Sequence, residues 1–128
     1  AIEWAKQRHP HSRVNYVAAS LLDPPDEWRR AFHLVHETYT LQALKAPQQE
    51  HAFPALAEFV APGGKLLVIC RTREEGSELT GPPWPLTRSQ VMRFAELGLT
   101  PRAYQSFVVR DGERAIPHAR AVFSREED

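Results

Sequence analysis

The chain has 128 residues, 42% of them hydrophobic, and its 16 Lys and Arg balance its 16 Asp and Glu, so the formal net charge is zero. This length suits a single globular domain, and the neutral balance gives no basic field for a nucleic-acid backbone. A single cysteine excludes an internal disulfide and a thiolate zinc site, and no apolar run approaches the roughly 18 residues of a membrane span. We therefore expect a cytoplasmic protein that binds a small molecule, with no metal and with neither a nucleic-acid nor a membrane partner.

Hydrophobic periodicity and turn residues predict alternating strands and helices along the chain. In chain order, the pattern indicates an opening helix around Ile2, a strand at residues 14–19, a short helix at 27–32, a strand at 33–40, a helix over 53–60, a strand at 65–70 and a helix after Thr87. The run at 65–70 is the most hydrophobic, which is typical of a central strand covered on both faces. Residues 73–85 have no periodicity and are rich in Pro and Gly, so we expect a loop long enough to have a function.

The end of the sequence predicts an antiparallel hairpin. Strand-like runs at 104–110 and 119–123 flank Asp111-Gly112, a dipeptide that favours a tight turn, with the return strand starting several residues after it. Alternating strands and helices followed by a hairpin predict one α/β domain, residues 1–128, with a mostly parallel sheet and a C-terminal antiparallel hairpin.

Three local sequences stand out within this order of elements: YVAASLLDPP at 16–25, FVAPGGKLLV at 59–68 and GPPWPLT at 81–87. They resemble the third-strand segment, the approach to the fifth strand and the substrate-covering Gly-Pro-Pro segment of the class I S-adenosylmethionine-dependent methyltransferases. The nearest resemblance is to the thiopurine-methyltransferase-like branch, which acts on small molecules. The resemblance implies a Rossmann-like sheet of order 3-2-1-4-5-7-6, of which this chain supplies strands three to seven.

The sequence departs from the family in two ways. Ser20 stands where the family has Asp, and the family's glycine-rich cofactor turn and the acidic residue that ends its second strand have no counterpart. Because the chain also starts at Ala1, without Met, we expect the C-terminal portion of a longer bacterial methyltransferase, inactive by itself. The strand at 14–19 would then lack its neighbours, so we expect a homo-oligomer or strand exchange through an exposed sheet edge.

The resemblance implies a site at the carboxyl ends of the strands, where open α/β sheets bind their ligands. The cofactor is S-adenosylmethionine, with contacts expected from Ala19, Ser20 and Leu21 beside the adenine and from His36 and Glu37 near the methyl donor. Glu37 is also the one candidate catalytic residue. The methyl acceptor is expected to lie against Tyr39, Pro82, Pro83, Trp84 and Pro85.

A structural interpretation stays open for each of these residues. His36 could lie at a strand end in contact with solvent, and Glu37 could cap the helix that starts near Leu41. Tyr39 could fill space in the hydrophobic core, and Trp84 could pack a mobile lid against the protein. Cys70 ends the most hydrophobic run, so we expect a buried core residue and not a nucleophile.

Two other functions also stay open. The Ser20 replacement and the missing glycine turn suit a non-catalytic Rossmann-like interaction module. A nucleotide-dependent oxidoreductase is the third possibility, although the closing hairpin and the sequence of residues 62–68 argue against it.

Overall fold

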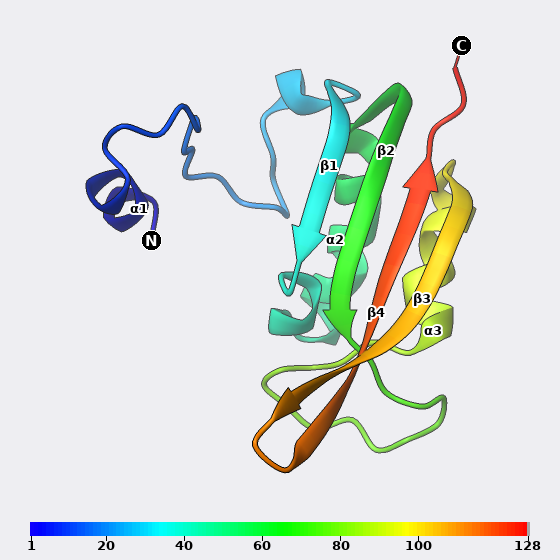
Figure 1. Ribbon diagram of the computed structural model, residues 1–128. Coiled ribbons are helices and arrows are strands. Elements are labelled where there is room, and N and C mark those ends of the chain that lie inside the picture. Colours follow the sequence, from blue (N-terminus) through cyan, green and yellow to red (C-terminus); the bar gives the residue numbers. More distant parts are fainter. Residues whose placement is uncertain (128) are drawn as a thin grey trace.

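The computed structural model describes residues 1–127 and shows a four-stranded sheet with helices packed against one face (Figure 1). The elements, in which η marks a short 3-10 helix, are α1 (Ile2–Arg8), η1 (Asp26–Trp28), β1 (Phe32–Thr38), η2 (Leu41–Ala43), α2 (Ala46–Phe59), β2 (Val60–Arg71), α3 (Arg88–Val91), η3 (Met92–Leu97), β3 (Thr100–Asp111) and β4 (Arg114–Ser124). The predicted α/β class is confirmed. Within the described residues, no helix has the length and apolar character needed to cross a membrane.

The strands of the sheet lie in the order β1-β2-β4-β3. β1 pairs with β2 in parallel, whereas the pairs β2–β4 and β4–β3 are antiparallel. The prediction of a mostly parallel sheet is therefore wrong, because the hairpin places its second strand, β4, beside β2. The observed order agrees with the 4-5-7-6 part of the sheet order that the resemblance implies.

The strand predicted at residues 14–19 is absent. These residues form no regular element and pair with no strand of the described chain, and the backbone bridge that follows joins Ser20 only to Asp23. Figure 1 shows α1 and this segment lying apart from the sheet. An alternating pattern needs a neighbouring strand for its amide and carbonyl groups and an apolar surface for its side chains, and this segment has neither.

The hydrophobic core lies between the sheet and the helices. β2 forms its floor, with four fully buried side chains: Val60, Leu66, Val68 and Cys70. Above them, Phe94 of η3 packs between Phe53 of α2 and Phe123 of β4, with ring centroids 4.9 and 5.3 Å apart. These three rings join both helical segments to the sheet, and β2 is the central strand that its hydrophobicity predicts.

α2 is longer than the predicted helix and begins at Ala46, because Pro47 lies in its first turn, where a missing amide proton costs nothing. Its buried side chains recur at helical spacing: Gln49, Ala52, Phe53, Leu56 and Ala57. At its end, the Arg125 guanidinium donates to the carbonyl oxygens of Ala57 and Val60, at 2.7 and 2.8 Å. These hydrogen bonds hold the C-terminal segment against the junction of α2 and β2.

The helix start after Thr87 and the C-terminal hairpin lie where the sequence predicts them. The Thr87 hydroxyl accepts from the amide of Gln90, whose side chain accepts from the amide of Thr87, and this capping box starts α3. η3 ends at Gly98 with φ at +87°.

The predicted hairpin is confirmed, but its return strand starts at Arg114, directly after a tight turn. The helix predicted at 27–32 is only a single 3-10 turn, since β1 already begins at Phe32.

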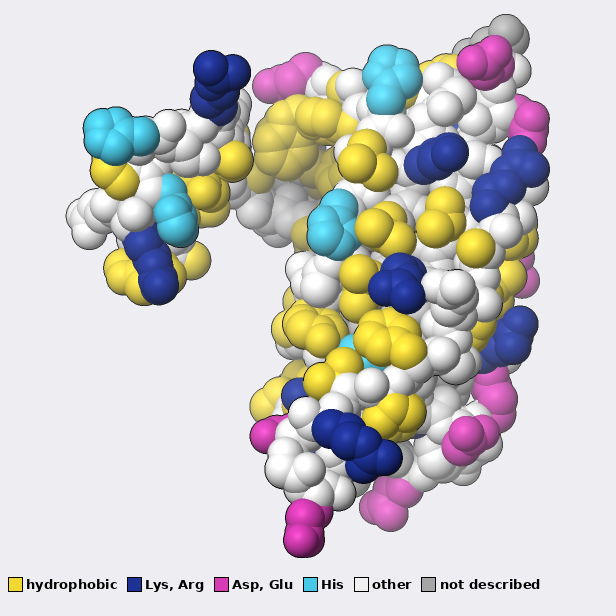
Figure 2. All heavy atoms as spheres, in the orientation of Figure 1, with side chains coloured by type: hydrophobic (Ala, Val, Ile, Leu, Met, Phe, Trp, Pro, Cys, Tyr) yellow, Lys and Arg dark blue, Asp and Glu magenta, His cyan; other side chains and the backbone are white. Residues whose placement is uncertain are grey.

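The second face of the sheet carries no helix in Figure 1. Leu34 of β1 is 66% exposed on the strand, while its neighbour Val35 is packed against the core. Figure 2 shows hydrophobic side chains on this face, interspersed with Lys, Arg and His side chains. The core of the described chain is therefore one-sided.

The one-sided core predicts unequal effects of truncating apolar side chains. Phe94→Ala should lower the free energy of unfolding by about 3–5 kcal/mol, because it empties the middle of the aromatic stack. Leu34→Ala, on the bare face, should change it by no more than about 0.5 kcal/mol. Urea unfolding followed by circular dichroism measures both, and an equal loss in the two variants would contradict a core on one face only.

Candidate functional site

The carboxyl ends of β1 and β2 meet at one edge of the sheet (Figure 1). Thr38 of β1 pairs with Ile69 of β2, and the amide of Tyr39 donates to the carbonyl of Ile69 at 3.1 Å as the chain turns into η2. Because β4 is antiparallel to β2, its first half lies at the same edge, where His118 pairs with Arg71. We call this the carboxyl edge, and it is the place where a parallel pair positions ligands.

Glu37 is buried beneath the turn that follows β1, with only 3% of its surface exposed. Its Oε1 atom accepts from the amides of Thr40 and Leu41, at 2.6 and 3.0 Å, so the carboxylate caps η2 as the structural interpretation expected. Its Oε2 atom is buried and has no partner among the described residues. An acceptor left unpaired in this way costs free energy, and it offers a position for an external donor.

Burial has the largest effect on the pKa of the Glu37 carboxyl group. Desolvation raises the pKa of the carboxyl above its ordinary value of 4.5, against the smaller opposing effects of the Leu41 and Thr40 hydrogen bonds and of His36. Burial also raises the pKa of the neighbouring Cys70 thiol to about 12, assisted by the negative charge of Glu37. Cys70 is therefore protonated at neutral pH, which agrees with a core residue.

Gln42 connects three segments of the carboxyl edge, namely η2, the end of β2 and the loop after β2, and it is not among the predicted site residues. Its side-chain oxygen accepts from the amide of Arg71 at 2.6 Å, and its carbonyl accepts from the amide of Trp84, also at 2.6 Å. Gln49 of α2 supports the same turn by donating to the carbonyl of Leu41 at 2.9 Å. The only available signal was a glutamine directly after a buried leucine in a predicted helix start.

Trp84 and its prolines reach the carboxyl edge from the loop after β2. The Trp84 ring is half-buried, with Lys45 above it at 5.9 Å, and a Cβ at Gly81 would lie 2.7 Å from the ring. Pro83 and Pro85 are half-buried, whereas Pro82 is exposed. The structure thus places this predicted acceptor wall beside η2.

Tyr39 and His118 meet across the end of β2. The Tyr39 hydroxyl lies 2.8 Å from Nε2 of His118, and Nδ1 of His118 lies 2.9 Å from the carbonyl oxygen of Ile116. Tyr39 is a predicted site residue and His118 is not, because a pairing between residues 79 positions apart leaves no local pattern.

The other predicted cofactor residues lie elsewhere. His36 is exposed on the bare face, because neighbouring residues of a strand point to opposite faces, and it shares a 2.6 Å hydrogen bond with the Thr38 hydroxyl. Ala19 and Ser20 are exposed and Leu21 is half-buried, and the Ser20 hydroxyl accepts from the amide of Leu22 at 3.2 Å. The structure therefore places the side chains of His36 and Glu37 on opposite faces of the sheet, and in the 19–21 segment Leu21 packs against the hydrophobic core.

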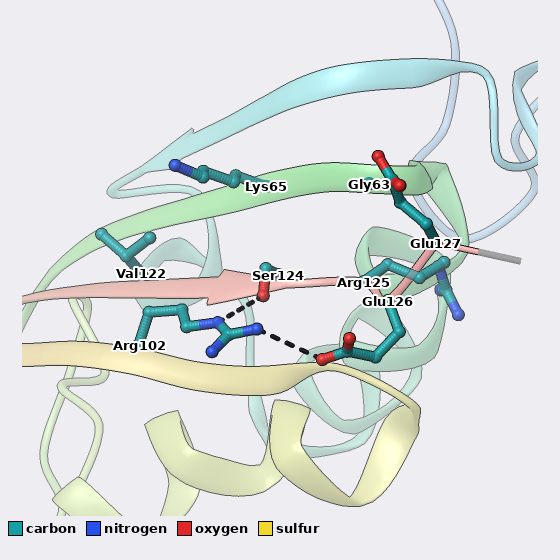
Figure 3. Close-up of a pocket in the computed structure, with 8 residues that line it drawn as sticks. All are labelled: Gly63, Lys65, Arg102, Val122, Ser124, Arg125, Glu126 and Glu127. Carbon is teal, nitrogen blue, oxygen red and sulfur yellow. Dashed lines mark hydrogen bonds and ion pairs between the residues drawn. The ribbon is translucent and has the colours of Figure 1, made fainter.

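A hollow of about 450 Å³ lies at the opposite end of β2 (Figure 3). Arg102 spans it by donating to the Ser124 hydroxyl at 2.7 Å and to Glu126 at 3.2 Å, and Lys65 also lines it. Its polar groups largely bind one another, unlike Oε2 of Glu37. Among residues 1–127, no three His, Cys, Asp or Glu side chains are grouped closely enough to hold a metal ion.

Comparison with solved structures identifies proteins that share the fold of this chain. No protein-family model matches the sequence, and no curated protein is similar to it. A SAM-dependent methyltransferase from Methanosarcina mazei superposes with a TM-score of 0.76 at 11% identity, over 100% of this chain and 78% of that one. The N-methyltransferase NodS from Bradyrhizobium japonicum, solved with S-adenosylhomocysteine, gives 0.72 at 19% identity, over 98% of this chain and 62% of that one.

A third solved structure is described as the [4+2]-cyclase SpnF. It superposes with a TM-score of 0.74 at 14% identity, and the superposition covers 98% of this chain and 61% of the cyclase. The chain therefore has the Rossmann-like fold of SAM-dependent methyltransferases, and a protein named for a different reaction shares that fold.

The buried carboxyl of Glu37 makes stability depend on pH. Because its folded-state pKa is raised, folding favours the protonated form, so this contribution is full below about pH 4.5 and is lost as pH rises through the folded-state pKa. Glu37→Gln keeps an acceptor for the two amides but has no group that titrates, so it should remove this loss of stability at rising pH. Its stability relative to the wild type should therefore increase with pH, by about 1.4 kcal/mol for each unit of the raised pKa. Urea unfolding at several pH values between 4 and 8 measures the difference, and a constant offset would contradict it.

Proposed function

We propose that the chain takes part in methyl transfer from S-adenosylmethionine to a small-molecule acceptor, at the carboxyl edge in the cytoplasm. The observation that carries the proposal is the unpaired Oε2 atom of Glu37, a buried acceptor at the edge where a parallel pair positions ligands. The shared fold supports the same proposal, because two of the superposed structures are described as methyltransferases. The resemblance of segments 59–68 and 81–87 to the thiopurine-methyltransferase-like branch supports a small acceptor.

The residues present fit the donor groups of this cofactor at one position. Oε2 of Glu37 would accept a hydrogen bond from one of them. Ser20 lies outside the carboxyl edge, and its hydroxyl, whose oxygen accepts from Leu22, would have its own proton left for the adenine. Ala19 and Leu21 would flank the ring. The bound cofactor supplies a methyl group on a sulfonium, which a nucleophile attacks in line.

The acceptor is proposed to lie between Tyr39 and the loop of Pro82 to Pro85. Trp84 offers a planar apolar wall whose backbone is fixed by its hydrogen bond to Gln42, in the turn that Glu37 caps. Methyl transfer needs little beyond holding the nucleophile about 3–3.5 Å from the methyl carbon. A rigid turn and a fixed aromatic wall meet that need.

The free edge of β1 favours a second candidate, an interaction module. In the described chain β1 pairs only with β2, so its outer edge presents unpaired amides and carbonyls beside the exposed Leu34. A homo-oligomer or strand exchange would use this edge. Light scattering after size exclusion tests it: a dimer that Leu34→Lys dissociates would favour this candidate, and a monomer at high concentration would argue against it.

Titration of S-adenosylhomocysteine into the ¹⁵N-labelled chain tests the methyltransferase proposal. Amide signals of Glu37 to Gln42 should shift on binding, while those of Gly63 and Lys65, in the hollow at the other end of β2, should stay in place. Glu37→Gln should weaken the affinity about tenfold, which is the loss of roughly 1.4 kcal/mol expected for a hydrogen bond to a charged or buried acceptor. Shifts confined to the hollow, or none at millimolar ligand, would count against the proposal.

A further inference from the structure

The hydrogen-bonded pair of Tyr39 and His118 has a use that the proposed function does not assign. Tyr39 lies directly after β1 in a left-handed conformation, with φ at +66°, which is uncommon for a residue with a bulky side chain. Its side chain is 43% exposed, whereas His118 of β4 is 2% exposed. The tyrosine therefore lies between the buried imidazole and the solvent at the carboxyl edge.

The direction of each hydrogen bond follows from the partner of Nδ1. The carbonyl oxygen of Ile116 can only accept, so Nδ1 of His118 carries a proton, and in the neutral tautomer of this ring Nε2 carries none. Nε2 then has a free lone pair, and the Tyr39 hydroxyl donates to it at 2.8 Å. The phenolic oxygen keeps its own lone pairs for another donor or an electrophile.

Neighbouring side chains hold the imidazole in this orientation. The Phe107 ring of β3 packs on His118 with centroids 5.2 Å apart, and the Tyr39 ring meets it edge-on at 5.6 Å. The charged neighbours are cations: Arg71 is the pairing partner of His118 on β2, and Arg120 lies over the Phe107 ring. Nε2 thus points at one group, the Tyr39 hydroxyl.

We infer that Tyr39 and His118 form a coupled proton-accepting pair, in which a group that bonds to the Tyr39 oxygen sends the phenolic proton to Nε2 of His118. Its use in methyl transfer rests on the proposed function. There, the acceptor X–H gives its proton to the Tyr39 oxygen, and the original phenolic proton moves to Nε2, leaving an imidazolium. The electron pair on X forms the bond to the methyl carbon, and the C–S electrons return to sulfur as a neutral thioether. Tyr39 is the residue in contact with the acceptor, and His118 acts through it as a positioning and proton-holding residue.

Labelling with phenylmethanesulfonyl fluoride tests the pair without cofactor or acceptor. The Tyr39 oxygen attacks the sulfonyl sulfur, the S–F bond breaks with loss of fluoride, and the phenolic proton passes to Nε2. The labelling rate at Tyr39, measured by peptide mass spectrometry at pH 7.5, should fall about a hundredfold in His118→Gln, whose amide cannot take a proton. His36→Gln is the matched control, because His36 bonds to Thr38, and it should leave the rate unchanged.

An equal labelling rate in His118→Gln and the wild type would overturn the inference and leave the pair as a structural brace. If His118→Gln does not fold, the ring ¹⁵N shifts of wild-type His118 decide: a proton on Nδ1 with an unprotonated Nε2 is expected, and a proton on Nε2 would overturn the inference. Because no cofactor takes part, failure of the labelling is distinct from failure of S-adenosylhomocysteine binding.

Discussion

Hydrogen bonding along both edges of β2 determines where every other element of the sheet lies. The parallel pairing with β1 brings two carboxyl ends together, and the antiparallel pairing with β4 brings the first half of that strand to the same place. Arg71, Glu37 and His118 thus reach one edge from three strands. The buried side chains of β2, packed under Phe94, keep this arrangement in place. The same strand has its amino end at the hollow of Figure 3, where Arg102 and Glu126 bind each other.

The carboxyl edge is rigid because buried polar groups fix its turn. Gln42, Gln49 and Oε1 of Glu37 are all hydrogen-bonded to backbone groups of η2 and its neighbours. Such hydrogen bonds contribute most to the free energy of folding where water is excluded, because a buried polar group without a partner is costly. Oε2 of Glu37 stands out against this background. A turn held so firmly, with one acceptor unpaired, has the character of a site prepared for a ligand.

The sequence predicted those features whose causes are local. The helix start after Thr87, the turn at Asp111-Gly112 and the hydrophobic run of β2 each depend on neighbouring residues, and each appears in the structure. The strand at 14–19 failed because its pattern needs a partner strand from elsewhere. The mostly parallel sheet failed because the pattern does not say which hairpin strand lies beside β2.

The site shows the same division between local and distant causes. Glu37 and Tyr39 could be singled out from their place at a strand end, and Trp84 from the Gly-Pro-Pro segment of its loop. Alternation along β1 separates His36 from Glu37, which only knowledge of the two faces of the sheet reveals. His118 and Gln42 act through partners far away in the sequence, so no motif marks them. The shared fold leaves both the ligand and its reaction to be argued from these side chains.

Glu37 holds the turn after β1 in a fixed conformation, and amide hydrogen exchange measures this directly. The amides of Thr40 and Leu41 donate to the buried carboxylate, so they should exchange slowly in the wild type and at least about tenfold faster in Glu37→Ala, as expected when bonds worth more than about 1.4 kcal/mol are lost. The amide of Gly76, in the loop after β2, is the exposed reference in both proteins. Exchange of Thr40 and Leu41 as fast as that of Gly76 in the wild type would contradict a preformed site at the carboxyl edge.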